Sequence, residues 1–304
     1  MVALIRGMIA GARNGLIACL AFGALVAPAW ADARLNAHYE IKMIGVTIGQ
    51  ITWNSDIAAD AYQTSANGKA SGALSMLVNG EGSVATKGII ENDMAENGVA
   101  ENGVAQTSRL VPTFFSANMT EDGEIAGLQM TFEDGAVKTL RTDKPLRDKK
   151  RVPVSEADRR DVDDPLSAML IPIPSGHDAM SPAICDRVLA IFDGQRRYNL
   201  ALAFKRADRL AIKRGYAGPV LVCAVVLQPI AGYRADSMLV KYVGGKSDME
   251  IWFAPVAGTS LVAPIRVSMP TMLGTLEIAA DRFETAAIKP APKTQQKTQP
   301  STPP

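Results

Sequence analysis

The sequence is poor in the side chains that bind transition metals, with three cysteines and two histidines among its 304 residues. Neither His38 nor His177 stands at a zinc-ligand spacing from a cysteine, so we expect no metal site and no cofactor. An excess of one charge is also missing, since 32 basic residues stand against 31 acidic residues. Proteins that bind nucleic acid carry a concentrated basic surface, so nucleic acid is not an expected partner.

The chain also lacks recognisable catalytic signatures. Neither a G-x-S-x-G nucleophile motif nor a glycine-rich phosphate-binding loop occurs. His177 and Asp178 could serve as a base and its orienting acid, with Ser167 or Ser175 as the nucleophile. Adjacent side chains seldom face each other, and His38 falls on the polar face of a predicted strand. We therefore assign no catalytic residue, and a periplasmic hydrolase stays as an alternative.

The N-terminus has the three parts of a secretion signal. Arg6 and Arg13 give it a positive start, and an apolar run follows over residues 16–26. Small residues end the segment and predict cleavage between Ala31 and Asp32. The apolar run is shorter than the roughly 20 residues that a transmembrane helix needs, so a retained anchor is the less favoured alternative. We expect a periplasmic protein whose mature form does not span the membrane.

The cysteines are consistent with export. Cys19 lies inside the predicted signal in a sequence that resembles a lipid-attachment site, and lipidation is a minor alternative. Cleavage would leave Cys185 and Cys223, and an even pair in an oxidising compartment predicts a disulfide. Such a bridge would close a loop of about 38 residues and contribute roughly 3–4 kcal/mol in the chain-entropy model. Two buried free thiols are the alternative.

Apolar residues recur at every second position over much of the chain, which is the pattern of half-buried strands. The clearest runs lie over residues 35–53, 128–132, 198–204, 249–253, 265–269 and 276–278. Residues 220–227 are apolar throughout, so we expect that strand to be covered on both faces. Gly49 interrupts the alternation and indicates a bulge. Turns are predicted at Asn67-Gly68, Asn79-Gly80, Asp122-Gly123, Asp134-Gly135, Asp193-Gly194 and Gly244-Gly245.

These features predict an all-β fold with one large antiparallel sheet that is strongly curled or barrel-like. A short helix is expected near 165–171, where Asp164 suits the N-cap and Pro165 the first helical position. The predicted single domain, residues 32–284, consists of N-terminal strands over 35–142, a charged connector over 143–164 and C-terminal strands over 185–284.

Two segments carry little apolar pattern. Residues 95–105 contain a tandem copy of A-E-N-G-V, which we expect to form a lengthened surface loop. Residues 285–304 are rich in proline, lysine and glutamine, and we expect this tail to be disordered.

Several groups could bind a ligand but are better explained otherwise. Acids in the connector could gather a divalent cation, although arginines among them favour a solvated linker; these acids are Asp158, Asp161, Asp163 and Asp164. The basic cluster over Lys144–Arg151 could meet lipid phosphates, but a solvated loop is expected. Trp53 and Trp252 could form a face for sugar or lipid, but their alternating strands favour core positions.

A set of short motifs, in order along residues 35–284, resembles a bacterial exported family known as domain of unknown function 3108. The motifs are Tyr39 with Gly45-Val46-Thr47-Ile48-Gly49, Gly72-Ala73-Leu74, Leu110-Val111-Pro112-Thr113-Phe114, Asp164-Pro165-Leu166-Ser167-Ala168, Phe192-Asp193-Gly194 with Tyr198, Gly215 with Cys223, Trp252 and Ala263-Pro264-Ile265. The resemblance implies an all-β periplasmic domain and supplies no catalytic residues. The chain is also loosely similar to alphaproteobacterial envelope-integrity proteins with a spiral β-sheet.

We therefore expect a non-catalytic periplasmic protein that supports cell-envelope integrity. Its partner would be an envelope lipid, a glycan or a protein, held in a concave apolar interior or on a long outer face. Besides the hydrolase, a structural adaptor that acts through loops and the tail is the remaining alternative.

Overall fold

The computed structural model of the chain describes residues 32–71, 80–100, 103–121, 124–143, 150–234, 236 and 248–288. The expected signal segment, which ends at Ala31, lies outside these ranges, so its cleavage before Asp32 stays a prediction. Strands dominate the described residues, and the helical elements among them are single 3-10 turns. No helix in this part of the chain is long and apolar enough to cross a membrane.

The elements follow the chain in this order: β1 (Ala33–Met43), β2 (Val46–Ile57), β3 (Ala61–Ala70), β4 (Gly80–Ala100), β5 (Gly103–Glu121), β6 (Glu124–Glu133), β7 (Ala136–Thr142), η2 (Ala157–Arg159), η3 (Ser167–Met169), β8 (Ile171–Pro172), η4 (Pro182–Ile184), β9 (Arg187–Phe192), β10 (Arg197–Ala211), β11 (Arg214–Gly215), β12 (Ala217–Ala231), β13 (Met249–Pro255), β14 (Leu261–Thr271) and β15 (Gly274–Ala287).

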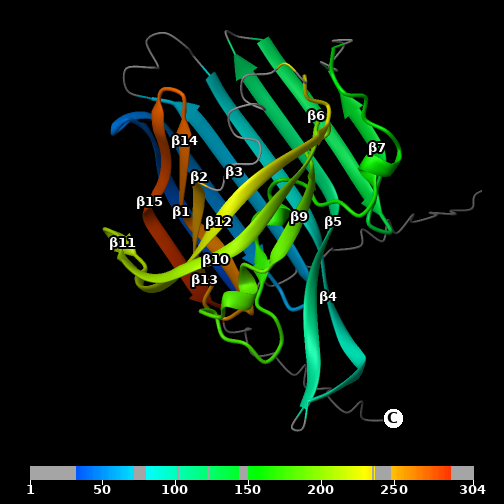
Figure 1. The fold of residues 1–304 in the computed structure, drawn as a ribbon, viewed down its shortest axis with the longest axis vertical. Coiled ribbons are helices and arrows are strands. Elements are labelled where there is room, and N and C mark those ends of the chain that lie inside the picture. Colours follow the sequence, from blue (N-terminus) through cyan, green and yellow to red (C-terminus); the bar gives the residue numbers. More distant parts are fainter. Residues whose placement is uncertain are drawn as a thin grey trace, which may run out of the picture.

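The strands form one large sheet, which confirms the predicted all-β antiparallel fold. Its order is β7-β6-β5-β4-β3-β2-β1-β15-β14-β13-β12-β10-β9, and neighbours along this path are antiparallel. The first strand therefore pairs with the last one in the middle of the sheet. Figure 1 shows that β10 and β12 cross in front of the N-terminal strands, so the sheet curls back over itself.

The connector joins the two ends of the strand order. Arg160 forms an antiparallel bridge with Ala136 at the start of β7, and Asp163 forms a parallel bridge with Ile191 of β9. Asp163 N–H donates to the carbonyl of Ala190 at 2.8 Å, and Phe192 N–H donates to the carbonyl of Asp163 at 3.0 Å. These backbone bonds cover two strand edges that would otherwise expose unpaired groups. The connector is thus a structural closure, and the expected solvated linker is wrong for its final residues.

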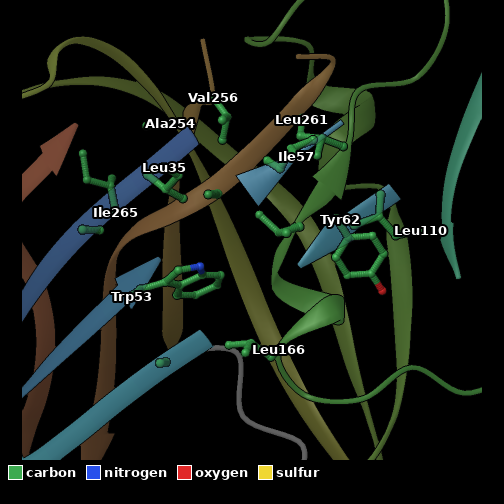
Figure 2. Close-up of a cluster of buried hydrophobic side chains, with 14 of the residues drawn as sticks. Leu35, Trp53, Ile57, Tyr62, Leu110, Leu166, Ala254, Val256, Leu261 and Ile265 are labelled. Atoms are coloured by element: carbon green, nitrogen blue, oxygen red, sulfur yellow. The ribbon is translucent and has the colours of Figure 1, made fainter. Parts of the chain in front are cut away.

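Two apolar clusters lie on opposite faces of β12. Val220 and Val222 belong to the larger cluster, whereas Leu221 and Cys223 belong to the smaller one. The prediction that residues 220–227 are covered on both faces is confirmed over this stretch, because successive side chains of a strand point to opposite sides. Figure 2 shows side chains from both halves of the chain in the larger cluster: Leu35, Trp53, Ile57, Tyr62, Leu110, Leu166, Ala254, Val256, Leu261 and Ile265.

The smaller cluster contains the cysteine pair. Cys185 follows η4 and Cys223 lies in β12, and the structure joins them in a disulfide with their Cα atoms 5.5 Å apart. Both residues are fully buried. The bridge ties the segment before β9 to the strand that divides the two clusters.

Several local predictions need correction. The expected helix near 165–171 is only the η3 turn, because Ile171 and Pro172 pair as β8 with Val262 and Leu261. Residues 95–100 and 103–105 are not a loop, since they belong to β4 and β5. Val99 of the first copy of the repeat pairs with Val104 of the second, and Figure 1 shows this hairpin extending away from the rest of the sheet.

The tail begins later than expected. β15 continues to Ala287, because residues 285–287 pair with Leu35, Arg34 and Ala33 of β1. The rest of the predicted disordered tail, residues 289–304, lies outside the described residues.

Among the predicted turns, Asn67-Gly68 is wrong because it lies inside β3, whereas Asp134-Gly135 is confirmed between β6 and β7. The bulge near Gly49 is also confirmed by a shift in the pairing of β1 with β2.

Candidate functional site

Two rows of polar side chains cross strands β2 to β5 on the outer face of the sheet, the face that points away from the larger cluster. The strand alternation produces this face, since Trp53 is buried inside while Thr52 is exposed outside. The first row runs through Gln50, Lys69, Glu81 and Thr120, and the second runs through Thr52, Asn67, Ser83 and Asn118. All eight line a cleft of about 460 Å³, here called the polar cleft.

The composition of the polar cleft suits uncharged polar ligands. Amide side chains offer donors and acceptors together, and hydroxyl groups can act as either. Lys69 stands directly opposite Glu81 in the strand register, so the two charges in the lining offset each other. Between the two rows, Gly68 and Gly82 are paired neighbours that line the cleft with backbone, since a side chain at Gly68 would point to the inner face towards Ile51.

A charged array borders the polar cleft on β1 and β15. His38 Nδ1 lies 2.6 Å from Asp281 Oδ1, and His38 Nε2 lies 3.2 Å from Oε1 of Gln50. Arg214 donates to the other oxygen of Asp281 at 2.7 Å. Burial raises the pKa of Asp281, but the hydrogen bonds from His38 and Arg214 outweigh it and hold the pKa below its usual value. Asp281 is the bulged residue at the shift in the β1–β15 pairing.

This array is not arranged for nucleophilic catalysis. Both imidazole nitrogens of His38 are engaged, one by a carboxylate and one by an amide oxygen. A general base needs a nitrogen in hydrogen-bond reach of the nucleophile. His38 is half-buried and not a fully exposed strand residue as expected.

The second histidine has a different partner from the one considered in the sequence. His177 Nδ1 lies 3.0 Å from Oγ of Ser181, and Asp178 accepts instead from the backbone N–H of Met180 at 2.7 Å. The hydroxyl of Ser181 also accepts from Ala183 N–H as the cap of η4. The proposed dyad of His177 and Asp178 is therefore not formed. A serine followed by proline is typical of a helix start, so the sequence Ser181-Pro182 could have identified Ser181 as a cap.

Ser167 belongs to a buried polar network around Asp164. One oxygen of Asp164 accepts from the backbone N–H groups of Leu166 and Ser167 at 2.9 and 3.0 Å. The other accepts from the hydroxyls of Ser167 at 2.5 Å and Thr86 at 2.8 Å. Burial raises the pKa of Asp164, and these hydrogen bonds act in the opposite direction. The N-cap position of η3 is Leu166 and not Asp164 as predicted, but Asp164 accepts from the backbone at the start of the turn, and it does so inside the protein, where it is 0% exposed.

The other connector acids do not gather around a cation. Asp158 accepts from the backbone N–H and hydroxyl of Ser155 at 2.8 and 2.6 Å. Asp163 is largely buried, and burial, followed by the charge of Asp164, raises its pKa to about 7 against the opposing effect of Arg109. Asp161 is exposed.

The tryptophans lie in the core, as expected from their strands. Trp53 and Trp252 both belong to the larger cluster, and neither forms an exposed face for sugar or lipid. Of the basic cluster, residues 144–149 lie outside the described residues. Arg151 is described and donates to the carbonyl of Gly232 at 2.9 Å.

Sequence reasoning missed the polar cleft. The alternation of Gln50 and Thr52 with Ile51 and Trp53 showed that one face of β2 is polar. Which residues of β3 to β5 stand beside them depends on strand register, and Asn67 had been placed in a turn.

Comparisons with known proteins give a family and a distantly similar solved structure. The family model described as Protein of unknown function (DUF3108) matches residues 37–281. No curated protein matches the chain. A crystal structure titled as a beta-barrel-like protein of domain of unknown function DUF1849, from Brucella abortus, is 9% identical and has a TM-score of 0.45. The alignment covers 85% of this chain and 98% of that one.

Proposed function

Because the chain belongs to the family described as Protein of unknown function (DUF3108), whose description assigns no activity, we propose a function from the structure itself. The protein is an exported, non-catalytic component of the cell envelope that binds a glycan in the polar cleft. The observation that carries this proposal is the pair of polar rows across β2 to β5, which lines a preformed cleft.

The chemistry of the lining favours a glycan over the other envelope partners. Each sugar hydroxyl is both a donor and an acceptor, which matches the amides of Asn67 and Asn118 and the hydroxyls of Thr52 and Ser83. The opposed charges of Lys69 and Glu81 leave little net field for an ionic ligand. No aromatic ring is among the residues that line the cleft, so affinity rests on hydrogen bonds and we expect it to be weak.

The interior of the curled sheet is a poorer binding place. Large side chains such as Phe192, Phe253 and Phe283 are fully buried in the two clusters and fill the space between the sheet's faces. Close-packed interiors leave few voids larger than a water molecule. Of the two locations expected from the sequence, the outer face is therefore the one we propose.

Export is the second part of the proposal. A buried disulfide between Cys185 and Cys223 is compatible with folding in an oxidising compartment. The predicted signal before Asp32 would bring the chain there.

Binding of the mature protein to peptidoglycan tests the glycan proposal. Soluble glycan strands would be titrated into the chain beginning at Asp32, and the affinity measured by calorimetry. The variants Asn67→Ala and Asn118→Ala each remove an amide from the cleft, and we expect each to weaken binding roughly fivefold, the equivalent of about one hydrogen bond.

The matched control is Asn199→Ala on β10, which removes the same group outside the cleft and should leave binding unchanged. Absence of binding by the unaltered protein, or equal losses in all three variants, would contradict the proposal.

A further inference from the structure

A second cleft, of about 440 Å³, lies where the connector meets the end of β12 and the turn between β9 and β10. Three arginines line it, Arg151 from the connector, Arg196 from the turn and Arg234 from the segment after β12. Two phenol rings, Tyr198 and Tyr233, and the carboxylate of Asp193 are the other polar groups of its wall. We call it the arginine cleft. It shares no lining residue with the polar cleft.

Backbone pairing holds these side chains together. Val152 N–H donates to the carbonyl of Tyr233 at 2.9 Å, and Gly232 N–H donates to the carbonyl of Val152 at 2.8 Å. Gly232 has a φ of +78°, and a Cβ at this position would lie 2.1 Å from the carbonyl oxygen of Gln195. Only glycine allows the end of β12 to approach the turn this closely.

Positive charge in the arginine cleft is incompletely neutralised. Within the described part of the chain, Arg151 has a hydrogen bond to the neutral carbonyl of Gly232 and no ion pair, and its Nε atom is buried without a partner. Arg196 reaches Oδ2 of Asp193 only at 3.5 Å, while Oδ1 of Asp193 accepts from the backbone N–H groups of Gln195 and Arg196 at 2.8 and 2.6 Å.

Arg234 forms a two-pronged ion pair with Asp236 at 3.0 and 2.8 Å. In the described part of the chain, the carboxylates that form ion pairs with these arginines belong to Asp193 and Asp236, against three guanidinium groups.

The phenols add neutral donors beside these cations. Burial raises the pKa of Tyr198 above its ordinary value and that of Tyr233 to about 12, so both hydroxyls keep their protons at neutral pH. Neither hydroxyl has a hydrogen-bond partner among the described residues. Arg196 also stacks over the ring of Tyr233, with its guanidinium carbon 5.9 Å from the ring centre. Leu227 contributes an apolar patch to the same wall.

We propose that the arginine cleft binds a phosphate ester, with Arg151 and Arg196 as the charged donors and Tyr198 and Tyr233 as neutral donors. Guanidinium groups match the geometry of phosphate oxygens, and several donors from separate elements suit the two terminal oxygens of a phosphodiester or the three of a monoester. The apolar patch at Leu227 fits the carbon side of an ester. The ester can be free or part of a lipid headgroup, because both present the same chemistry.

Two probes separate these sources. Glycerol 3-phosphate titrated into the mature protein tests the free ester, and vesicles of phosphatidylcholine with and without phosphatidylglycerol test the lipid. The variants Arg151→Gln and Arg196→Gln should each weaken binding of the responding probe about tenfold or more, because charge-assisted hydrogen bonds are lost. Added salt should weaken binding by the unaltered protein as well.

Arg209→Gln on β10 is the matched control, because it removes one exposed positive charge outside the cleft. It should leave affinity unchanged, and near-ultraviolet circular dichroism checks that each variant is folded. Binding of glycerol 3-phosphate supports the free ester, and binding only to phosphatidylglycerol vesicles supports the lipid. The proposal is overturned if neither probe binds, or if Arg209→Gln weakens binding as much as the cleft variants do.

Discussion

The hydroxyl oxygens of Tyr62 and Ser167 lie 2.7 Å apart in the buried interior, although 105 residues separate them in the chain. Tyr62 belongs to β3 and Ser167 opens the η3 turn after the connector. Ser167 also contacts Thr86 of β4, at 3.0 Å between hydroxyl oxygens, and Asp164. The segment that closes the sheet is therefore fastened to its N-terminal strands by buried hydrogen bonds.

Removal of the Asp164 carboxylate should destabilise the protein strongly. In Asp164→Ala, the two backbone N–H groups and two hydroxyls that it accepts from lose their partner in a buried place. We expect the free energy of unfolding to fall by about 2–4 kcal/mol, measured by urea denaturation. Asp186→Ala removes an exposed carboxylate and should cost less than about 0.5 kcal/mol. Similar losses in both variants would show that the buried network contributes no more to the free energy of unfolding than an exposed carboxylate does.

Asp163 should make stability fall as pH rises towards neutrality. Burial and the neighbouring Asp164 raise its pKa from the ordinary 3.8 to about 7 in the folded state. Between these two values the folded protein binds more protons than the unfolded chain, so the free energy of unfolding decreases with rising pH. In Asp163→Asn this contribution is absent. The stability of the variant relative to the unaltered protein should therefore increase by on the order of 2–4 kcal/mol from pH 4 to pH 7.

Denaturation curves at several pH values measure this difference. Asp186→Asn, at an exposed position, serves as the control. The difference in unfolding free energy between this variant and the unaltered protein should stay constant with pH. A constant difference for Asp163→Asn as well would mean that the carboxyl of Asp163 titrates normally in the unaltered protein.

Reduction of the disulfide should lower stability by roughly 3–4 kcal/mol, because the bridge restrains a loop across a sequence separation of 38 residues. Urea denaturation with and without reductant measures the loss. The double variant Cys185→Ala with Cys223→Ala should show it without reductant and should not respond to reductant. Alkylation of two free thiols in the untreated, unfolded protein would contradict the bridge.

Two glycines with the same backbone conformation separate torsional strain from close packing. Gly176 and Gly232 have φ values of +75° and +78°, but a Cβ meets nothing within 4 Å at Gly176 and would clash with Gln195 at Gly232. We expect Gly176→Ala to cost about 1 kcal/mol of unfolding free energy and Gly232→Ala at least about 1 kcal/mol more. Thermal unfolding measures both variants. Equal costs would mean that the turn with Gln195 shifts away from the added Cβ at little cost in free energy.

The positions of the strands along the chain could be predicted from the sequence better than the partners with which they pair in the sheet. Alternation at Met249, Ile251 and Phe253 marks β13, although the strand is buried on both faces, with Ile251 and Phe253 in the smaller cluster and Trp252 in the larger one. The pairing of β1 with β15 cannot be read in this way, because it joins residues more than 230 positions apart. The same dependence on register hid the polar cleft. Asn67-Gly68 has the composition of a turn, yet the partners on β2 and β4 hold it in a strand.

The local backbone hydrogen bonds of Asp164 were predictable, but its burial was not. An aspartate followed by proline commonly accepts from the backbone N–H groups just after it, and Asp164 does so from Leu166 and Ser167. Its contacts with Thr86 and the link from Ser167 to Tyr62 come from strands about 80 and 100 residues earlier. The charged residues before it predicted a solvated segment, and of these Glu156, Arg160 and Asp161 are exposed.

The location of a bound glycan tests the central claim most directly. Nitrogen-edited nuclear magnetic resonance resolves the side-chain amides of Asn67 and Asn118, which line the polar cleft, and the indole N–H of Trp53, which donates to Ser55 on the inner face. On addition of soluble peptidoglycan strands, the two amide signals should shift while the indole signal stays in place. A shift of the Trp53 indole with unchanged Asn67 and Asn118 amides would place the ligand inside the sheet and contradict the account.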